Sequence, residues 1–126
     1  MPAIQGRTRE QLRQHIGRVI GAAYVSSATA SGSTTTLVDN SIVLGGADTQ
    51  IGKWVRFTSG SNDTLTRRVT DSAIASNVTT LTFMPAATAS TASESYELWE
   101  GDYSPDSIDD FINQSIISAT GWVYDP

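Results

Sequence analysis

The segment KWVRFTSGSNDTLTRRVTD, residues 53–71, decides how the middle of this chain folds. Two runs that alternate apolar and polar residues flank a turn containing Gly60, Asn62 and Asp63. Alternation with a period of two is the pattern of a strand, and Gly, Asn and Asp favour the tight turn between antiparallel strands. The segment therefore predicts a β-hairpin.

Further runs rich in β-branched and aromatic residues surround this hairpin and are separated by turn residues. The predicted strands are residues 24–30, 34–39, 53–58, 64–70, 78–83 and 96–99. Short neighbouring strands of this kind indicate an antiparallel barrel or sandwich.

A helix is predicted on the N-terminal side of the strands, over about residues 8–23. Thr8 followed by Gln11 forms a capping box, which satisfies backbone N–H groups at a helix start. The apolar residues that recur at helical spacing within an arc of about 100° are Leu12, Ile16, Val19, Ile20 and Ala23. We expect this stripe to face the core, with Arg13 at its edge.

A second helix is predicted over about residues 104–120. Ser104 is a favoured N-cap, Pro105 suits the first helical position, and Gly121 is a natural stop. The expected apolar stripe is Ile108, Phe111, Ile112, Ile116 and Ala119. The acids Asp106, Asp109 and Asp110 are expected on the other, solvated side.

These elements predict a single domain over residues 1–126, a length that suits one core. The fold class is α+β: an N-terminal helix, an antiparallel β-barrel or sandwich of about six short strands within residues 24–100, and a C-terminal helix that pairs with the first.

Charge is distributed unevenly along the chain, which carries a net charge of −5. The four arginines among the first 18 residues are Arg7, Arg9, Arg13 and Arg18. From Glu94 onward the chain has eight acids and no Lys or Arg. This asymmetry predicts pairing between the two ends, within a subunit or between neighbours, and argues against an open basic surface for nucleic acid.

Residues for catalysis, metal binding or cofactor binding do not form a recognisable pattern. The chain has no cysteine, so thiolate metal sites and disulfides are excluded. Its single histidine, His15, has no local nucleophile or orienting acid. No phosphate-binding glycine motif is present. We therefore expect no enzyme activity, no metal and no cofactor.

Targeting and membrane signals are also missing from the sequence. The segment 1–14 lacks an apolar signal core, and no apolar run approaches the roughly 20 residues that span a bilayer. We expect a protein made in the cytoplasm and no membrane partner.

Some residues on the helices suggest contact with other subunits. Ile117 lies about 180° from Ile108, among polar residues, which suggests that the second helix has two contact faces. The segment GWVYDP, residues 121–126, adds apolar residues that need a surface to bury against. The candidate subunit or portal interface is Arg7, Arg18, Asp106, Asp110, Ile117, Trp122, Val123 and Tyr124.

Two other binding surfaces stay open as alternatives. Trp54, Tyr96 and Trp99 are candidate stacking platforms for a carbohydrate, provided that they are exposed. The hairpin also has a basic character, which allows a weak nucleic-acid surface; its basic residues are Lys53, Arg56, Arg67 and Arg68.

Several segments of the chain resemble head–tail connector (adaptor or neck) proteins of tailed bacteriophages. They are TREQLRQHIGRVIGA (8–22), STTTLVDNS (33–41), RRVTD (67–71), YELW (96–99) and SPDSIDDFINQSI (104–116). The resemblance implies helices that pack beneath a portal, a β-rich insertion between them, and a commonly dodecameric ring that joins the portal to tail or fibre proteins in the virion. It implies no catalytic residues. Longer members are expected to have another β-rich segment after the second helix, so this chain is expected to be shortened or only partly built.

The sequence thus leads to the hypothesis of a virion structural protein that acts as a head–tail connector subunit. DNA would pass nearby without specific binding, because acidic helices repel phosphate. Capsid decoration, tail-fibre attachment and carbohydrate binding remain the alternatives.

Overall fold

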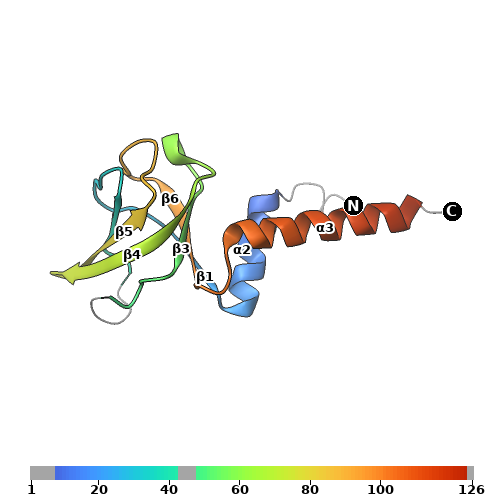
Figure 1. The fold of residues 1–126 in the computed structure, drawn as a ribbon, viewed down its shortest axis with the longest axis horizontal. Helices are drawn as coiled ribbons and strands as arrows, with labels where there is room; N and C mark the ends of the chain where they lie inside the picture. The colour runs from blue at the N-terminus through green and yellow to red at the C-terminus, as the bar shows by residue number, and fades with distance from the viewer. Residues whose placement is uncertain (1–7, 43–47, 125–126) are drawn as a thin grey trace.

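A computed structural model shows the fold, and describes residues 8–42 and 48–124, with side chains through residue 115 (Figure 1). A helix opens the described chain, six strands and a short 3₁₀ turn follow, and a long helix closes it. The elements are α2 (Arg9–Ile20), β1 (Ala23–Ser27), β2 (Thr36–Asp39), β3 (Trp54–Phe57), η1 (Gly60–Asn62), β4 (Thr66–Ala75), β5 (Val78–Met84), β6 (Ser95–Trp99) and α3 (Pro105–Tyr124).

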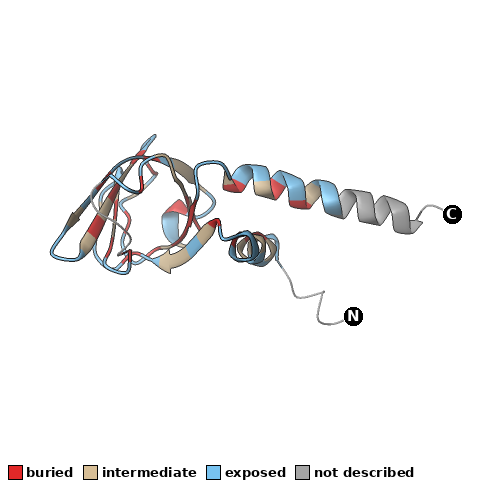
Figure 2. Ribbon diagram, turned by 90° about the horizontal axis from the view of Figure 1, so that it is seen from below, coloured by how far each residue is buried: buried red, intermediate tan, exposed pale blue. Residues whose placement is uncertain are grey.

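The strands form one antiparallel sheet in the order β1-β6-β3-β4-β5-β2. The predicted hairpin is confirmed, because β3 pairs with β4 across the turn that holds η1. The sheet is open, but it curls until its two edge strands approach at a single bridge between Ala30 and Val38 (Figure 2). The predicted α+β class, with helices on either side of six strands in the sequence, is confirmed.

The inner face of the curled sheet holds the apolar core. Phe57 and Phe83 meet edge to face there, with ring centroids 5.7 Å apart. The other large side chains of this core are Leu37, Ile42, Val55, Val69, Leu81, Tyr96 and Leu98. Burial of these side chains is the main force that holds the sheet in its curled shape.

The outer face of β3 and β6 carries a second set of side chains, under the helices. Trp54 is opposite Trp99, and Arg56 is opposite Glu97, in the register of these two strands. Trp99 and Glu97 are both fully buried. A charged pair of positions therefore lies inside the molecule, between the sheet and the helices.

Helix α2 begins as predicted but packs through a different face. Thr8 and Gln11 exchange the two hydrogen bonds of the capping box, at 3.1 and 2.9 Å. The buried residues of α2 are Arg13 and Gly17, whereas Val19 is 70% exposed. The predicted core-facing stripe is therefore wrong for Val19.

The reason is a close approach at Gly17. A Cβ atom at this position would lie 2.8 Å from the Trp99 ring, so only glycine allows the helix to rest on the indole. This contact rotates α2 so that Arg13, and not the apolar stripe, points toward the sheet. Ile20 at the end of the helix is consequently 48% exposed.

Helix α3 also differs from its prediction in extent and in facing. It runs through Gly121, which therefore is not its stop. A glycine ends a helix when it adopts the left-handed conformation, as Gly21 does after α2 with φ of 71°. Ile112 is buried as expected, but Phe111 is 61% exposed and Asp109 is buried in its place.

Candidate assembly interface

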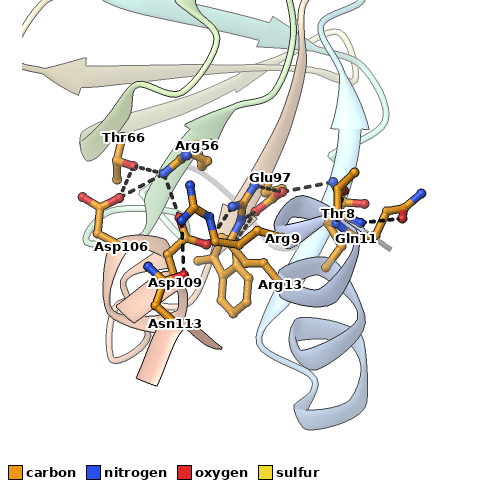
Figure 3. A network of polar contacts seen from close by, with 12 residues as sticks. Thr8, Arg9, Gln11, Arg13, Arg56, Thr66, Glu97, Asp106, Asp109 and Asn113 are labelled. Carbon is orange, nitrogen blue, oxygen red and sulfur yellow. Dashed lines mark hydrogen bonds and ion pairs between the residues drawn. The ribbon is translucent and has the colours of Figure 1, made fainter. Parts of the chain in front are cut away.

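An ion-pair network joins the two helices to the outer face of the sheet (Figure 3). Its centre is Arg13, which donates from Nε to Oε1 of Glu97 and from Nη2 to Oε2, both at 2.7 Å. Glu97 also accepts from Trp99 Nε1 at 2.8 Å and from Gln14 Nε2 at 3.0 Å. Each oxygen of this buried carboxylate therefore has two donors.

The network continues from Arg13 into α3. Nη1 of Arg13 donates to Oδ1 of Asp109 at 2.8 Å. Nη1 of Arg56, on β3, donates to Oδ2 of the same carboxylate at 3.3 Å and to Oδ1 of Asp106 at 3.1 Å. Thr66 adds a hydrogen bond to Asp106 at 2.9 Å. The start of α3 is thus held to α2, β3 and β4 by charge-assisted hydrogen bonds, which are stronger than neutral ones.

The electrostatics of Arg13 show how this burial is tolerated. Burial by itself lowers the pKa of the Arg13 guanidinium. The hydrogen bonds and charges of Glu97 and Asp109 raise this pKa by more than burial lowers it, so the net shift is upward. Arg13 therefore stays charged. Because a buried ion pair is costly when one partner is missing, α2, α3 and β6 are held in one relative arrangement.

Sequence reasoning missed this network, although it expected the arginines of one end to pair with the acids of the other. That expectation is realised within the subunit, by Arg13 with Asp109. The prediction that Asp109 lies on the solvated side of α3 is wrong, because Asp109 is 8% exposed. One feature of the sequence pointed to the network: Arg13 lies at the edge of the apolar stripe of α2. An arginine at such a position is favourable when the sheet supplies an acidic partner.

The candidate interface residues differ in whether they are exposed and in whether they already have a partner within the subunit. Arg18 and Asp110 lie on the surface, as the hypothesis requires. Asp106 is exposed as well, but it is engaged within the subunit by Arg56 and Thr66. Arg7 lies outside the described residues, and Ile117, Trp122, Val123 and Tyr124 lie where only the backbone of α3 is described.

A buried carboxylate outside this network, Asp39, joins the two edge strands. It accepts hydrogen bonds from Ser26 Oγ and from the N–H and Oγ of Ser41, each at 2.8 Å, and from the hydroxyl of Tyr96. Burial alone would raise the pKa of Asp39, but these bonds outweigh it and hold the pKa below its usual value. Burial and the Asp39 carboxylate raise the pKa of Tyr96. Asp39 is therefore a structural anion that links β1, β2 and β6.

The residue considered for catalysis, His15, is exposed on α2. Among residues 8–42 and 48–115, whose side chains are described, no group of three or more His, Cys, Asp or Glu side chains is placed to hold a metal ion. Within the described chain, neither helix is long and apolar enough to cross a membrane.

The aromatic residues considered for sugar stacking are mostly covered. Tyr96 and Trp99 are fully buried. Trp54 is partly buried, donates from Nε1 to the Gly101 carbonyl at 3.0 Å, and has the Arg68 guanidinium 4.4 Å from its ring centroid. A flat exposed row of rings is therefore not formed, which argues against the carbohydrate-binding alternative.

The basic residues of the hairpin are largely engaged within the protein. Lys53 pairs with Glu100 at 3.0 Å, and Arg56 pairs with Asp106 and Asp109. Arg67 donates to the Ala86 carbonyl at 3.2 and 3.1 Å. Phosphate binding needs clustered free cations, so this surface is poorly suited to nucleic acid.

An apolar groove of about 360 Å³ lies between the start of β1 and the segment that follows β2. Its walls include Ala22, Tyr24, Ile42 and Leu98, and the Lys53–Glu100 pair also borders it. Such walls suit an apolar side chain better than a charged ligand.

Comparison of the chain with protein-family models, with curated proteins and with solved structures finds no match.

Proposed function

We propose that this chain is a structural subunit of a tailed-bacteriophage virion, a head–tail connector that assembles as a ring between the portal and the tail. The observation that carries the proposal is the geometry of α3. This helix has 20 residues, about 30 Å of length, and extends away from the β body (Figure 1). The ion pairs described above hold its first turns. A long helix with one anchored end offers its remaining length to another chain.

The described surface of the helices supports the same role. Val19 is 70% exposed and Phe111 is 61% exposed, on α2 and α3 respectively. Exposed apolar side chains contribute to a contact site when they belong to a contiguous patch rimmed by polar groups. The buried network holds both helices to the sheet. The outer faces of the helices therefore keep a fixed orientation relative to the sheet.

The acidic balance of the chain fits a wall along which DNA slides. The net charge of −5 disfavours binding of phosphate groups. The subunit would be made in the cytoplasm of the bacterial host and reside in the virion, with the β body available to tail or fibre proteins.

Native mass spectrometry of the purified chain, alone and mixed with the isolated portal of the same virus, tests the proposal. We expect a ring of subunits, dodecameric in the simplest case, or a monomer that assembles only on the portal. A protein that ignores the portal at every concentration would overturn the connector role. Capsid decoration or fibre attachment would then be tested by mixing the same sample with capsids and with fibres.

A further inference from the structure

We infer that the outer face of α3 in one copy docks on the outer face of α2 in a second copy of this chain. The inference deepens the proposed function, on which it rests, by naming the two surfaces that meet. It comes from the described side chains of both helices.

The outer face of α2 lies opposite the residues that contact the sheet. Arg13 and Gly17 point inward, so positions half a turn away point to solvent. The residues there are Gln11, His15, Arg18 and Val19, all of them exposed. This face combines a basic residue with an adjacent large apolar one.

The outer face of α3 has the same layout with the opposite charge. Asp109 and Ile112 point inward. The exposed residues on the other side are Ser107, Asp110, Phe111 and Gln114. Here an acidic residue is adjacent to a large apolar one, so the two faces are complementary in charge and alike in apolar content.

Neither charge has an ion-pair partner among the described side chains of the same subunit. Within the part of the chain whose side chains are described, Arg18 and Asp110 take part in no ion pair, whereas Arg13, Arg56, Asp106 and Asp109 do. Both charges are therefore available to a second copy of the chain. A pairing of unlike faces between copies gives each of them an opposite charge.

The symmetry of the contact follows from the charges. Two copies of the α2 face would bring Arg18 against Arg18, and two copies of the α3 face would bring Asp110 against Asp110. Repulsion disfavours both, so the contact joins unlike faces. When each copy uses its two faces on two different neighbours, the contact is heterologous, repeats from copy to copy and closes into a ring when the rotation permits. Val19 and Phe111 would supply the buried apolar centre of this contact.

Cysteine cross-linking tests the pairing directly, because the chain has no cysteine of its own. Val19→Cys and Phe111→Cys are made as separate variants and oxidised mildly, alone and mixed. We expect a disulfide-linked dimer in the mixture and little in either variant alone, since a disulfide needs Cα atoms within about 7 Å. Ser61→Cys, on the exposed turn of the hairpin, replaces Val19→Cys in the control mixture.

Charge reversal gives a second measurement that leaves the apolar residues in place. Arg18→Glu and Asp110→Arg are each expected to weaken self-association about tenfold or more, because each puts like charges opposite one another. Mixing the two variants, or combining both changes in one chain, is expected to restore association. Both residues are exposed and lie outside the ion-pair network, so far-UV circular dichroism should show an unchanged fold.

The outcomes separate this inference from the proposed function. A cross-link between two Val19→Cys copies, or a ring that is indifferent to both charge reversals, overturns the inference and leaves the connector role intact. A specific Val19–Phe111 cross-link in a protein that ignores the portal supports the inference and overturns the connector role. Failure of both the cross-link and the charge swap overturns the inference by itself.

Discussion

Arg13 and Glu97 form a two-point ion pair whose side chains are 3% and 0% exposed, between the first helix and the last strand. They are 84 residues apart in the sequence, so the pair closes nearly the whole described chain into one unit. Because Asp109 shares the same guanidinium, the pair also fixes where α3 leaves the body. The orientation of the surfaces proposed for assembly depends on it.

Removing one charge of this pair should strongly destabilise the fold. Glu97→Gln leaves the buried Arg13 with half of its compensation, and we expect a loss of about 3–5 kcal/mol in the free energy of unfolding. Urea denaturation followed by circular dichroism measures it. The matched control is Glu100→Gln, whose side chain is 52% exposed and pairs with Lys53, and which should cost about 0–1 kcal/mol. Equal effects of the two variants would show that the buried pair does not hold the fold.

Gly17→Ala tests whether the close approach of α2 to Trp99 sets the facing of the helix. Alanine by itself favours a helix over glycine by about 1 kcal/mol. The added Cβ would lie 2.8 Å from the Trp99 ring and closer still to Ala23, which requires α2 to move. Overpacking of this kind costs about 1–3 kcal/mol, so we expect net destabilisation and a changed tryptophan emission.

His15→Ala, on the exposed side of the same helix, is the control for Gly17→Ala and should be neutral or slightly stabilising. A Gly17→Ala protein more stable than the unchanged chain would mean that the helix does not rest on the indole.

Asp39 should make stability depend on pH in the acid range. Its pKa in the folded protein lies below the unfolded value of about 3.9, so the folded state favours the ionised form. Its contribution is therefore fully present above about pH 4 and is lost as the pH falls through the folded pKa. Urea midpoints of the unchanged chain and of Asp39→Asn, measured from neutral pH downward, isolate the contribution of Asp39 to the free energy of unfolding.

Asp39→Asn should be less stable at neutral pH by about 1.5–3 kcal/mol, the value of hydrogen bonds to a charged group. The difference between the two proteins should shrink below about pH 4. A difference that stays constant with pH would contradict an ionised Asp39 as the link between the edge strands.

The capping box at the start of α2 makes a smaller, local contribution. Thr8→Ala removes the acceptor for the Gln11 N–H, and we expect a loss of about 1 kcal/mol in the free energy of unfolding. Thr8→Ser keeps the hydroxyl and should stay close to the unchanged chain. Thermal unfolding of the three proteins measures both changes, and a Thr8→Ser protein as unstable as Thr8→Ala would assign the effect to the methyl group.

The helices and strands are predictable from the amino-acid sequence, because the signals for them are local. The Thr8–Gln11 capping box predicts where α2 begins, and the alternating runs on both sides of the Gly60–Asp63 turn predict the hairpin of β3 and β4. All six predicted strands are present, and the α+β class follows from their number and from the helices on either side. Hydrogen bonds within a few residues decide such features, so the neighbouring sequence is sufficient.

The buried faces of the helices depend on contacts between distant parts of the chain. Val19 and Phe111 belong to apolar stripes and yet are exposed, while the charged Arg13, Glu97 and Asp109 are buried. Helical spacing gives the relative angles of side chains but not the rotation of the helix about its axis. That rotation is set by the contact of Gly17 with Trp99 and by an ion pair between Arg13 and Glu97, which are 84 residues apart in the sequence. A charged side chain is stable inside a protein only where the fold places an opposite charge next to it. The distance between two residues far apart in the sequence cannot be read from a linear pattern.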